Sequence, residues 1–431
     1  MGTRLGGIMR RKKFGSLILT VCLTLGLLSG CENTSSVENE STEEKQTVLR
    51  FFHYQGEAEA AYNKVFDAYE EAHPNVKIVS EFLNSASYAS TLEARIATKD
   101  YPDIIGVHPG SIQVLPLAEA GYLEDLTGQR CLLDISEGNL KTASLEAGIY
   151  GVPTDQSYIC TFYNKDMFEK YQLSVPQTWE EFLNVCQRLK EEGITPISMG
   201  YKDIWLESLI PYALVPTTIY RSNMNFDDDL YAQRKHFNGK EWNETLGKLK
   251  ELMDRGYVTE NFMKTSYDQQ LAAFANGQAA MMIMGTWGVA MVQNLNESCN
   301  FGLFITPGSD DGVNWISSSV GGMLSVCKDS KQKDTAVDFL NFFLGTDEVY
   351  CRFLEDTGNL SARMNFSADC EPELQMLIKD IPGSYFFLDE KWPRSFQNEF
   401  LKMIGEVGIG ANISEALGHL DDAWEKEVLD K

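Results

Sequence analysis

Segments with the apolar pattern of strands alternate with segments of helical periodicity near the start of the folded chain. Val48–Tyr54 and Val76–Leu83 are apolar runs typical of strands. Between them, Glu57–Glu71 repeats apolar residues at helical spacing, and a second helix at Ser87–Lys99 leads to a third strand at Pro102–Val107. Strands and helices that alternate at this spacing predict a parallel sheet covered by helices, which places the fold in the α/β class.

The remainder of the chain keeps this mixed character. At 431 residues it is long enough for two domains or one two-lobed unit, on a prior of roughly 150 residues per domain. Thr178 and Glu181 have the spacing of a capping box and predict the start of a helix. Further elements are expected as helices at 178–192, 237–255, 266–276, 335–344 and 395–430, and as strands at 279–284, 301–305 and 320–326.

The charge of the chain limits its partners. The formal net charge is −25, and it becomes −30 without residues 1–30, which hold five basic and no acidic side chains. Such a chain is a poor nucleic-acid binder, because phosphate binding needs clustered Lys and Arg. It would also be repelled by anionic lipid. Solubility is the simplest explanation of the acidity, and a cationic ligand such as a polyamine is an open alternative.

Sequence motifs for catalysis, cofactors and metals are missing. The chain has no phosphate loop, no H-E-x-x-H and no G-x-S-x-G, and its five histidines are isolated from one another. Besides Cys22 and Cys31, seven scattered cysteines form no C-x-x-C pair, so neither a zinc site nor a disulfide framework is expected. We therefore assign no catalytic residue, cofactor or metal ligand. Carboxylates are abundant, so counting alone does not exclude a glycosidase pair.

The amino terminus has the pattern of an export signal. Arg10–Lys13 is basic, and Phe14–Leu28 is apolar but too short to span a bilayer comfortably. Leu28-Ser29-Gly30-Cys31 resembles the lipobox of bacterial lipoproteins. The resemblance implies that residues 1–30 are a signal peptide and that Cys31 receives the lipid and becomes the first mature residue. An uncleaved membrane anchor with an incidental cysteine is the alternative.

A polar segment separates Cys31 from the folded part. Residues 31–46 are rich in Ser, Thr, Glu and Asn, and Val37 is the single apolar side chain after Cys31. Such a segment cannot bury apolar surface, so we expect a disordered tether that holds the folded body away from the lipid.

Several motifs occur in an order that is typical of one protein family. They are Tyr101–Ile105, Tyr150–Asp155 with Phe162–Asp166, Val175–Phe182, Phe274–Met281 with Gly285–Trp287, and Ala336–Thr346. By these motifs, over roughly residues 48–360, the chain resembles the family 1 extracellular solute-binding proteins of ABC importers, the maltose-binding-protein-like group. Gly106–Gly110 departs from the aromatic and charged cluster that maltose-binding protein has after the same strand, so those ligand contacts do not transfer.

The resemblance implies a two-lobed periplasmic-binding-protein-like fold. Each lobe would be a mainly parallel sheet flanked by helices, and a hinge of several crossing segments would join them. Lobe 1 would comprise residues 48–153 and 322–357, and lobe 2 residues 154–320 and 358–431. Gly321, Gly322 and Gly358 suit crossing segments that must change dihedral angles when the lobes close.

Sugar binding needs flat apolar faces for the rings and polar groups for the hydroxyls. The family places an aromatic residue at the position of Trp287, which is the first candidate. Each candidate also has a structural alternative: core packing for the tryptophans, solvation for Asp155 and Arg363, a helix start for Glu57 and a turn for Asn84. The expected ligand-binding residues are Trp287, Asp155, Tyr54, Glu57, Asn84, Trp205, Trp315 and Arg363.

The functional expectation is a lipid-anchored, extracellular solute-binding protein that performs no chemistry. It would capture a sugar or oligosaccharide by lobe closure and deliver it, as a monomer, to a membrane permease served by a separate ATPase. The anchor suggests a Gram-positive-type envelope. The alternatives are the same fold binding a polyamine, peptide or other small solute, a ligand sensor for a membrane kinase, and a surface glycosidase or lyase.

Overall fold

The computed structural model describes residues 46–364, 366, 372–379 and 381–429. The expected signal peptide, the lipidation site Cys31 and the tether up to residue 45 lie outside the described residues. Within the described ranges, no helix combines the length and apolar character needed to cross a bilayer.

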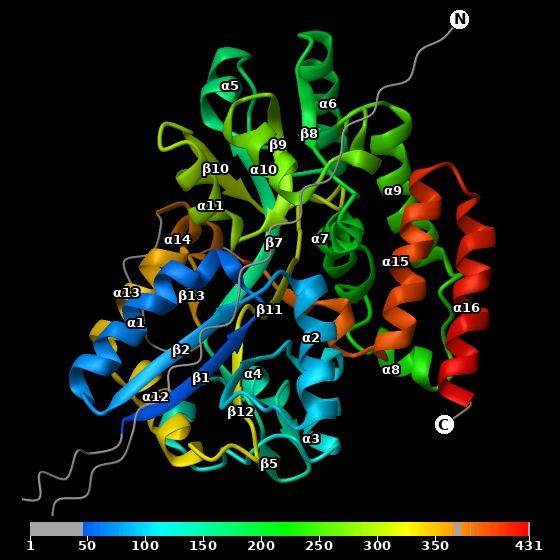
Figure 1. Ribbon diagram of the computed structural model, residues 1–431. Helices are drawn as coiled ribbons and strands as arrows, with labels where there is room; N and C mark the ends of the chain where they lie inside the picture. Colours follow the sequence, from blue (N-terminus) through cyan, green and yellow to red (C-terminus); the bar gives the residue numbers. More distant parts are fainter. Residues whose placement is uncertain (1–45, 365, 367–371, 380, 430–431) are drawn as a thin grey trace, which may run out of the picture. The chain divides into compact units, whose positions relative to one another are not determined.

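The first of two large sheets has five strands in the order β2-β1-β3-β12-β6 (Figure 1). β1 pairs in parallel with β2 and β3, whereas β12 runs antiparallel to β3 and β6. We call the part of the chain built on this sheet the first lobe. Its sheet strands are β1 (Thr47–His53), β2 (Val76–Phe82), β3 (Ile104–Gly106), β6 (Val152–Pro153) and β12 (Met323–Val326).

Helices cover both faces of this sheet because side chains alternate along its strands. On β1, Leu49 and Phe51 face a core formed with α1, α12 and α13, while Phe52 faces a second core formed with α2 and α3. The continuous apolar run that predicted the strand therefore reflects burial on both faces. The other elements of the first lobe are η1 (Gly56–Ala58), α1 (Glu59–Ala72), α2 (Ser85–Thr98), η2 (Gly110–Ile112), α3 (Val114–Glu119), η3 (Arg130–Leu132), α4 (Glu137–Lys141), β4 (Ser144–Leu145), β5 (Gly148–Ile149), α12 (Lys333–Gly345) and α13 (Asp347–Thr357).

The second sheet, on which the second lobe is built, is mixed. β8 and β9 are parallel, as are β11 and β14, but the long strand β7 is antiparallel to β9, β10, β11 and β13. The expectation of a mainly parallel sheet is wrong for this lobe, because β7 enters the lobe where β11 leaves it. The strands are β7 (Asp155–Asn164), β8 (Thr195–Ser198), β9 (Ala279–Gly285), β10 (Phe301–Phe304), β11 (Ile316–Val320), β13 (Leu360–Ser361) and β14 (Ser384–Phe386).

Two helices of the second lobe, both expected from the sequence, begin at capping boxes. The Thr178–Glu181 capping box is formed at the start of α6, and Ser266 with Gln269 forms another at α10. α15 and α16 pack side by side (Figure 1). The elements are α5 (Lys165–Lys170), α6 (Trp179–Glu191), η4 (Ile204–Ser208), α7 (Leu209–Val215), η5 (Pro216–Tyr220), α8 (Phe226–Tyr231), α9 (Lys240–Asp254), η6 (Phe262–Lys264), α10 (Tyr267–Ala275), α11 (Gly288–Leu295), α14 (Pro372–Lys379), η7 (Leu388–Glu390), α15 (Arg394–Gly408) and α16 (Ile413–Leu429).

Three segments carry the chain between the two sheets. β6 ends at Pro153 and β7 begins at Asp155, β11 ends at Val320 and β12 begins at Met323, and α13 ends at Thr357 before β13. The single strand expected at 320–326 is therefore wrong, because Gly321 and Gly322 divide it between the two sheets. Gly358 adopts the left-handed conformation at φ +66°, which favours glycine.

Candidate ligand-binding site

Strand direction determines which loops of the second lobe face the first. β11 runs toward its crossing to the first sheet, and β8, β9 and β14 run in the same direction. The loops after these strands therefore lie at the end of the sheet from which the chain crosses, which we call the crossing end. Loops and helix starts at the carboxyl ends of strands are where ligands bind in open α/β sheets. These loops carry Trp205 after β8, Trp287 after β9 and Phe387 after β14.

The first lobe has the same arrangement. β12 begins at the crossing end and runs antiparallel to β3, so β1, β2 and β3 all end there. Tyr54 follows β1, Glu57 lies in η1, and His108 lies in the loop after β3. The loops that follow the strands therefore lie at the crossing end in both lobes.

Four aromatic side chains of the second lobe form a connected cluster. The ring centroids of Trp205 and Trp287 are 6.4 Å apart, Trp205 lies 5.0 Å from Tyr267, and Phe387 lies 6.4 Å from Trp287. Each of the four is partly buried, so each keeps an accessible face. A Cβ on Gly285 would overlap the Trp287 ring, which explains the glycine at the end of β9. We call these four residues the aromatic cluster.

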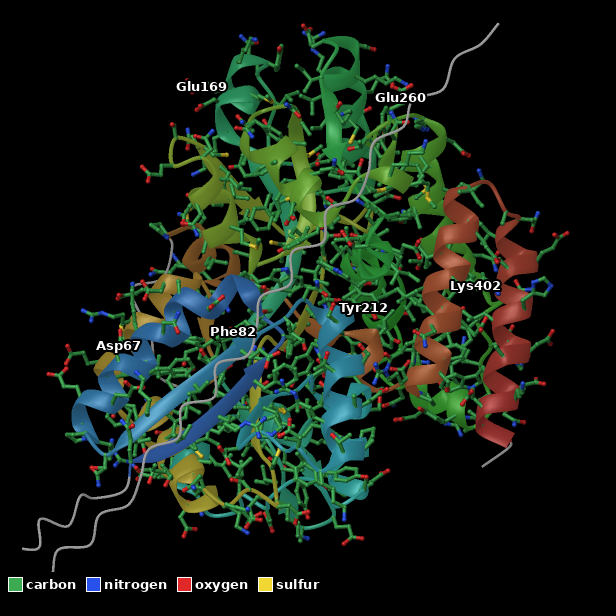
Figure 2. The ribbon with its side chains drawn as sticks, in the orientation of Figure 1. Asp67, Phe82, Glu169, Tyr212, Glu260 and Lys402 are labelled. Carbon is green, nitrogen blue, oxygen red and sulfur yellow. The ribbon has the colours of Figure 1, made fainter. Side chains whose placement is uncertain are left out.

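Neighbouring side chains hold two rings of the aromatic cluster in place. Phe387 lies 5.9 Å from the ring of Tyr212 on α7, which is labelled in Figure 2. The Tyr267 hydroxyl contacts Met291 at 2.9 Å. Burial and then the charge of Glu57 raise the pKa of the Tyr267 phenol. Glu57 belongs to the first lobe, so its charge acts on Tyr267 from across the junction between the lobes.

The first lobe contributes a stack of rings and one carboxylate. Tyr54 stacks on His53 at 4.8 Å and on His108 at 4.0 Å. The Tyr54 hydroxyl is buried without a hydrogen-bond partner, and its pKa is raised by burial and by the charges of Asp155 and Glu57. Glu57 is exposed to solvent on one side. The protein that surrounds the rest of its carboxyl raises the pKa of this group. Burial also lowers the pKa of His108 to about 4, which keeps this imidazole neutral.

Asp155 lies inside the hinge and is only 1 % exposed. Its carboxylate accepts hydrogen bonds from the backbone N–H of Gly322 and the side-chain amide of Asn359. The expected role as a ligand contact is not supported, since both acceptor oxygens are occupied by the other two crossing segments. Burial raises the pKa of Asp155 to about 6, although its hydrogen bonds oppose the shift.

Three other expected ligand residues are engaged elsewhere. Asn84 caps α2 by accepting from the N–H of Ser87 at 2.9 Å, so the turn alternative describes it. Arg363 donates to the carbonyl of Leu344 and to Asp347 in the first lobe. Trp315 precedes β11, so it lies at the end of the sheet opposite the crossing end, where its indole fills the space beside Gly383. Trp205, Trp287, Tyr54 and Glu57 are the expected residues that the structure brings together.

Tyr267, Phe387 and His108 were missed from the sequence. Tyr267 is the first residue of α10, directly after the Ser266 capping residue. That position was a detectable signal, because side chains at helix starts lie at the carboxyl ends of strands in α/β folds. Phe387 belongs to the last seventy residues, which carry no recognisable motif, and only the parallel pairing of β14 with β11 places it.

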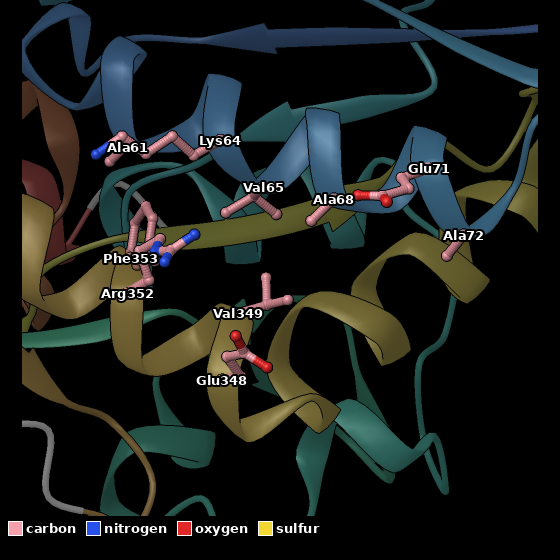
Figure 3. Close-up of a pocket in the computed structure, with 10 residues that line it drawn as sticks. All are labelled: Ala61, Lys64, Val65, Ala68, Glu71, Ala72, Glu348, Val349, Arg352 and Phe353. Atoms are coloured by element: carbon pink, nitrogen blue, oxygen red, sulfur yellow. The ribbon is translucent and has the colours of Figure 1, made fainter.

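A separate pocket of about 350 Å³ lies between α1 and α13 on the first lobe (Figure 3). Lys64 at its rim is already paired with Asp356 at 2.7 Å. The pocket contains none of the residues at the crossing end and is distinct from the candidate site. Its lining consists of Ala61, Lys64, Val65, Ala68, Glu71, Ala72, Glu348, Val349, Arg352 and Phe353.

Comparison with known proteins identifies the family. The model of the bacterial extracellular solute-binding proteins matches residues 55–350, which is more than half of the chain. The chain belongs to this family. It is a binding protein rather than an enzyme, and its family places it outside the cytoplasm.

Relatives and solved structures agree with this assignment. The Multiple sugar-binding protein of Streptococcus mutans is 26% identical over 390 residues, covering 88% of this chain and 90% of that protein. The Melibiose/raffinose/stachyose-binding protein MelE of Bacillus subtilis is 23% identical over 345 residues, covering 76% of each. In fold, the solute-binding protein is similar to a chitin oligosaccharide binding protein, with a TM-score of 0.79, 19% identity and coverage of 89% and 100%. RafE in complex with raffinose gives a TM-score of 0.75, 18% identity and coverage of 89% and 99%.

Proposed function

We propose that this protein captures a sugar or oligosaccharide between its lobes for an ABC importer. The aromatic cluster carries the proposal. Its four rings offer partly accessible apolar faces at 5.0–6.4 Å spacing, and sugar rings pack their C–H faces on such surfaces. The names of the Streptococcus mutans and Bacillus subtilis relatives, which denote sugar binding, support the same ligand class.

The four aromatic rings, rather than the charges, favour a sugar over a polyamine. The carboxylates next to the cluster include Glu57 and Asp268, whose charges raise the pKa of Tyr267, and Asp203, which accepts a hydrogen bond from the Tyr267 backbone N–H at 2.8 Å. Asp155 is withdrawn into the hinge, and burial keeps His108 neutral. Tyr54 and Glu57 supply a hydroxyl and a carboxylate to bond sugar hydroxyls when the lobes close.

Lobe closure supplies the signal that a permease would recognise. A ligand that contacts Trp287 in one lobe and Glu57 in the other binds the closed arrangement better than the open one, so binding shifts the population toward closure. We propose residues 48–153 with 322–357 and 154–320 with 358–431 as the moving lobes, with Gly321, Gly322 and Gly358 at the hinge. The sheet assignment supports these limits, although Arg363 bonds back to the first lobe.

The anchor and partners complete the proposal. After removal of residues 1–30, lipid on Cys31 holds the monomeric protein at the outer face of the cell membrane, beside permease subunits driven by a separate ATPase. The lipobox motif supports this, as does the likeness to an uncharacterised lipoprotein of Streptomyces antibioticus, 23% identical over 340 residues, covering 76% of this chain and 72% of that protein.

Calorimetric titration tests the ligand class. Raffinose, melibiose, chitin oligosaccharides and spermidine are titrated into the mature protein, and at least one sugar is expected to bind while spermidine does not. Trp287→Ala should abolish most of that affinity, whereas Trp315→Ala, at the opposite end of the same sheet, serves as the matched control and should leave it unchanged. Binding of spermidine and of no sugar would overturn the carbohydrate assignment.

A further inference from the structure

Besides the three crossing segments, the two lobes touch through the side chain of Ser111. Ser111, in η2 of the first lobe, donates its hydroxyl to the carbonyls of Glu390 at 3.0 Å and of Trp392 at 2.7 Å. Both acceptors belong to the loop after β14 in the second lobe, which we call the 387–392 loop. One hydroxyl proton is shared between the two carbonyls, so the Ser111 side chain ties the loop to the first lobe.

The backbones at this contact approach so closely that only glycine fits beside Ser111. Gly110 has φ +64°, and a Cβ there would lie 2.5 Å from the carbonyl oxygen of Glu390. The Gly110 N–H in turn donates to the carbonyl of Thr142 at 2.7 Å, which fixes η2 to the first lobe. An exposed ion pair between Arg394 and Glu93, at 3.8 Å, lies in the neighbouring elements α15 and α2 but adds little on its own.

The second lobe holds the 387–392 loop from the other side. The Glu390 carboxylate accepts a hydrogen bond from the hydroxyl of Ser319, close to the second crossing segment. The Trp392 indole is fully buried and donates to Asp227 at 3.3 Å. The Tyr231 hydroxyl donates to the carbonyl of Lys391 at 2.6 Å. The loop is therefore held firmly by the second lobe, and Ser111 contacts it from the first lobe.

Both ends of this contact lie next to ligand-facing rings. Phe387, at the start of the loop, belongs to the aromatic cluster. On the other side, η2 begins two residues after His108, whose ring stacks on Tyr54. The backbone N–H of His108 donates to the side-chain oxygen of Gln113 at 3.0 Å. Movement of η2 away from the loop would separate Phe387 from the Tyr54–His108 stack and would break the hydrogen bonds of Ser111.

We propose that Ser111 is a positioning residue, which docks the Phe387-bearing loop of the second lobe onto the first lobe and so couples the ligand-binding rings to the lobe arrangement. The coupling to ligand rests on the proposed function, whereas the docking itself does not. A ligand that packs on Phe387 and Tyr54 together then stabilises the docked arrangement, and loss of the Ser111 hydroxyl removes part of that stabilisation.

The docking is tested without ligand by amide hydrogen exchange on the mature full-length protein. Ser111→Ala is expected to raise exchange of the amides in the 387–392 loop about fivefold to tenfold, as loss of one hydrogen bond predicts. Ser111→Thr keeps the hydroxyl and should restore protection. Ser90→Ala removes an exposed serine hydroxyl on α2 of the same lobe and should leave the loop unchanged. Gly110→Ala, which would collide with Glu390, should exceed the effect of Ser111→Ala.

Coupling to ligand is tested with raffinose as the probe, or with whichever sugar of the titration panel the wild type binds. Ser111→Ala should weaken binding about fivefold, and Ser111→Thr should restore it. Unchanged loop exchange in Ser111→Ala would overturn the proposal, and so would an equal rise in exchange throughout both lobes, since that indicates general destabilisation. If no sugar binds the wild type, the proposed function fails while loop exchange still decides whether Ser111 docks the loop.

Discussion

The Asp155 carboxylate accepts a hydrogen bond from the side-chain amide of Asn359 in the core of the hinge. The same carboxylate accepts from the N–H of Gly322, so one side chain joins all three crossing segments. The Tyr350 hydroxyl adds a second tie, because it donates to the carbonyl of Thr154 at 2.7 Å and accepts from the N–H of Ala362 at 3.0 Å. The hinge is thus a buried polar junction.

Asp155→Asn should remove a pH dependence from the stability of the protein. Burial raises the pKa of Asp155 from 3.8 to about 6, so the native state binds its proton more tightly than the unfolded chain does. The resulting stability is present below pH 4 and is lost as the pH rises through about 6, an effect on the order of 2–3 kcal/mol. Asparagine is accepted because Asn359 can turn its amide, whose Oδ1 is buried without a partner.

Urea unfolding of the wild type and Asp155→Asn between pH 4 and 8 checks this prediction. The difference between the two curves is the informative quantity, because His53 acts in the opposite sense. Burial lowers the pKa of His53 to about 3, so its contribution to stability is lost as the pH falls below about 6.5. A difference that does not change with pH would contradict the proposed titration of Asp155.

Asn359→Asp should destabilise the hinge strongly at neutral pH. It would place a second carboxylate against Asp155 and remove the amide donor, which leaves two like charges buried together. The loss in unfolding free energy should shrink from pH 8 to pH 5, where one carboxyl takes up a proton. Asn359→Ala is the control, since it removes the donor without adding charge and should show a smaller, less pH-dependent loss.

Trp287→Ala should lower sugar affinity about tenfold or more while leaving the fold intact. The ring is partly buried at the carboxyl end of β9, so its loss removes a stacking face and little core. Trp315→Ala is matched in chemistry and lies at the opposite end of the sheet. Equal loss of affinity in both variants would show that the crossing end of the second lobe is not where the ligand binds.

Gly322→Ala should cost more stability than Gly358→Ala. At residue 358 the cost is about 1 kcal/mol, the penalty of a left-handed backbone for alanine. At residue 322 a Cβ would lie 3.0 Å from an Asp155 carboxylate oxygen and would overlap the Thr154 hydroxyl, so the hinge must shift. Gly247→Ala, in α9 with open space around it, is the control and should be neutral or stabilising. Urea unfolding at constant pH measures all three.

Cys31→Ala should release the protein into the medium and abolish its labelling by palmitate, because no thiol remains at the lipobox. Sugar affinity of the released protein should equal that of the wild type. Cys22→Ala, within the apolar part of the leader, is the control and should leave the protein cell-bound. Retention of Cys31→Ala at the membrane would support the alternative of an uncleaved anchor.

The sequence predicted local elements well because their causes are local. The apolar run of β1 and the capping box of α6 involve residues close together in the chain. Trp287 was predicted from the strand and glycine before it and from the family resemblance, and Trp205 from its loop-like surroundings. Trp315 was chosen by the same loop-like pattern, but sequence does not show that it precedes its strand at the wrong end of the sheet.

Long-range pairing explains the remaining errors. Asp155 has a polar side chain beside a crossing segment, as a ligand contact would have, but its partner Asn359 lies far along the chain. Phe387 enters the site only through the pairing of β14 with β11. The antiparallel partners of β7 likewise follow from crossings that no local motif encodes, so the second sheet could not be predicted to be mixed.

The position of β12 determines the order in which the lobes can be completed. This strand lies between β3 and β6 in the first sheet, yet it is synthesised only after most of the second lobe. The core of the first lobe also needs α12 and α13, which follow β12. The first lobe therefore stays incomplete until residues beyond 323 have emerged during export. Because its sheet is completed late and by strands far apart in the chain, the first lobe is the part most dependent on protection from aggregation.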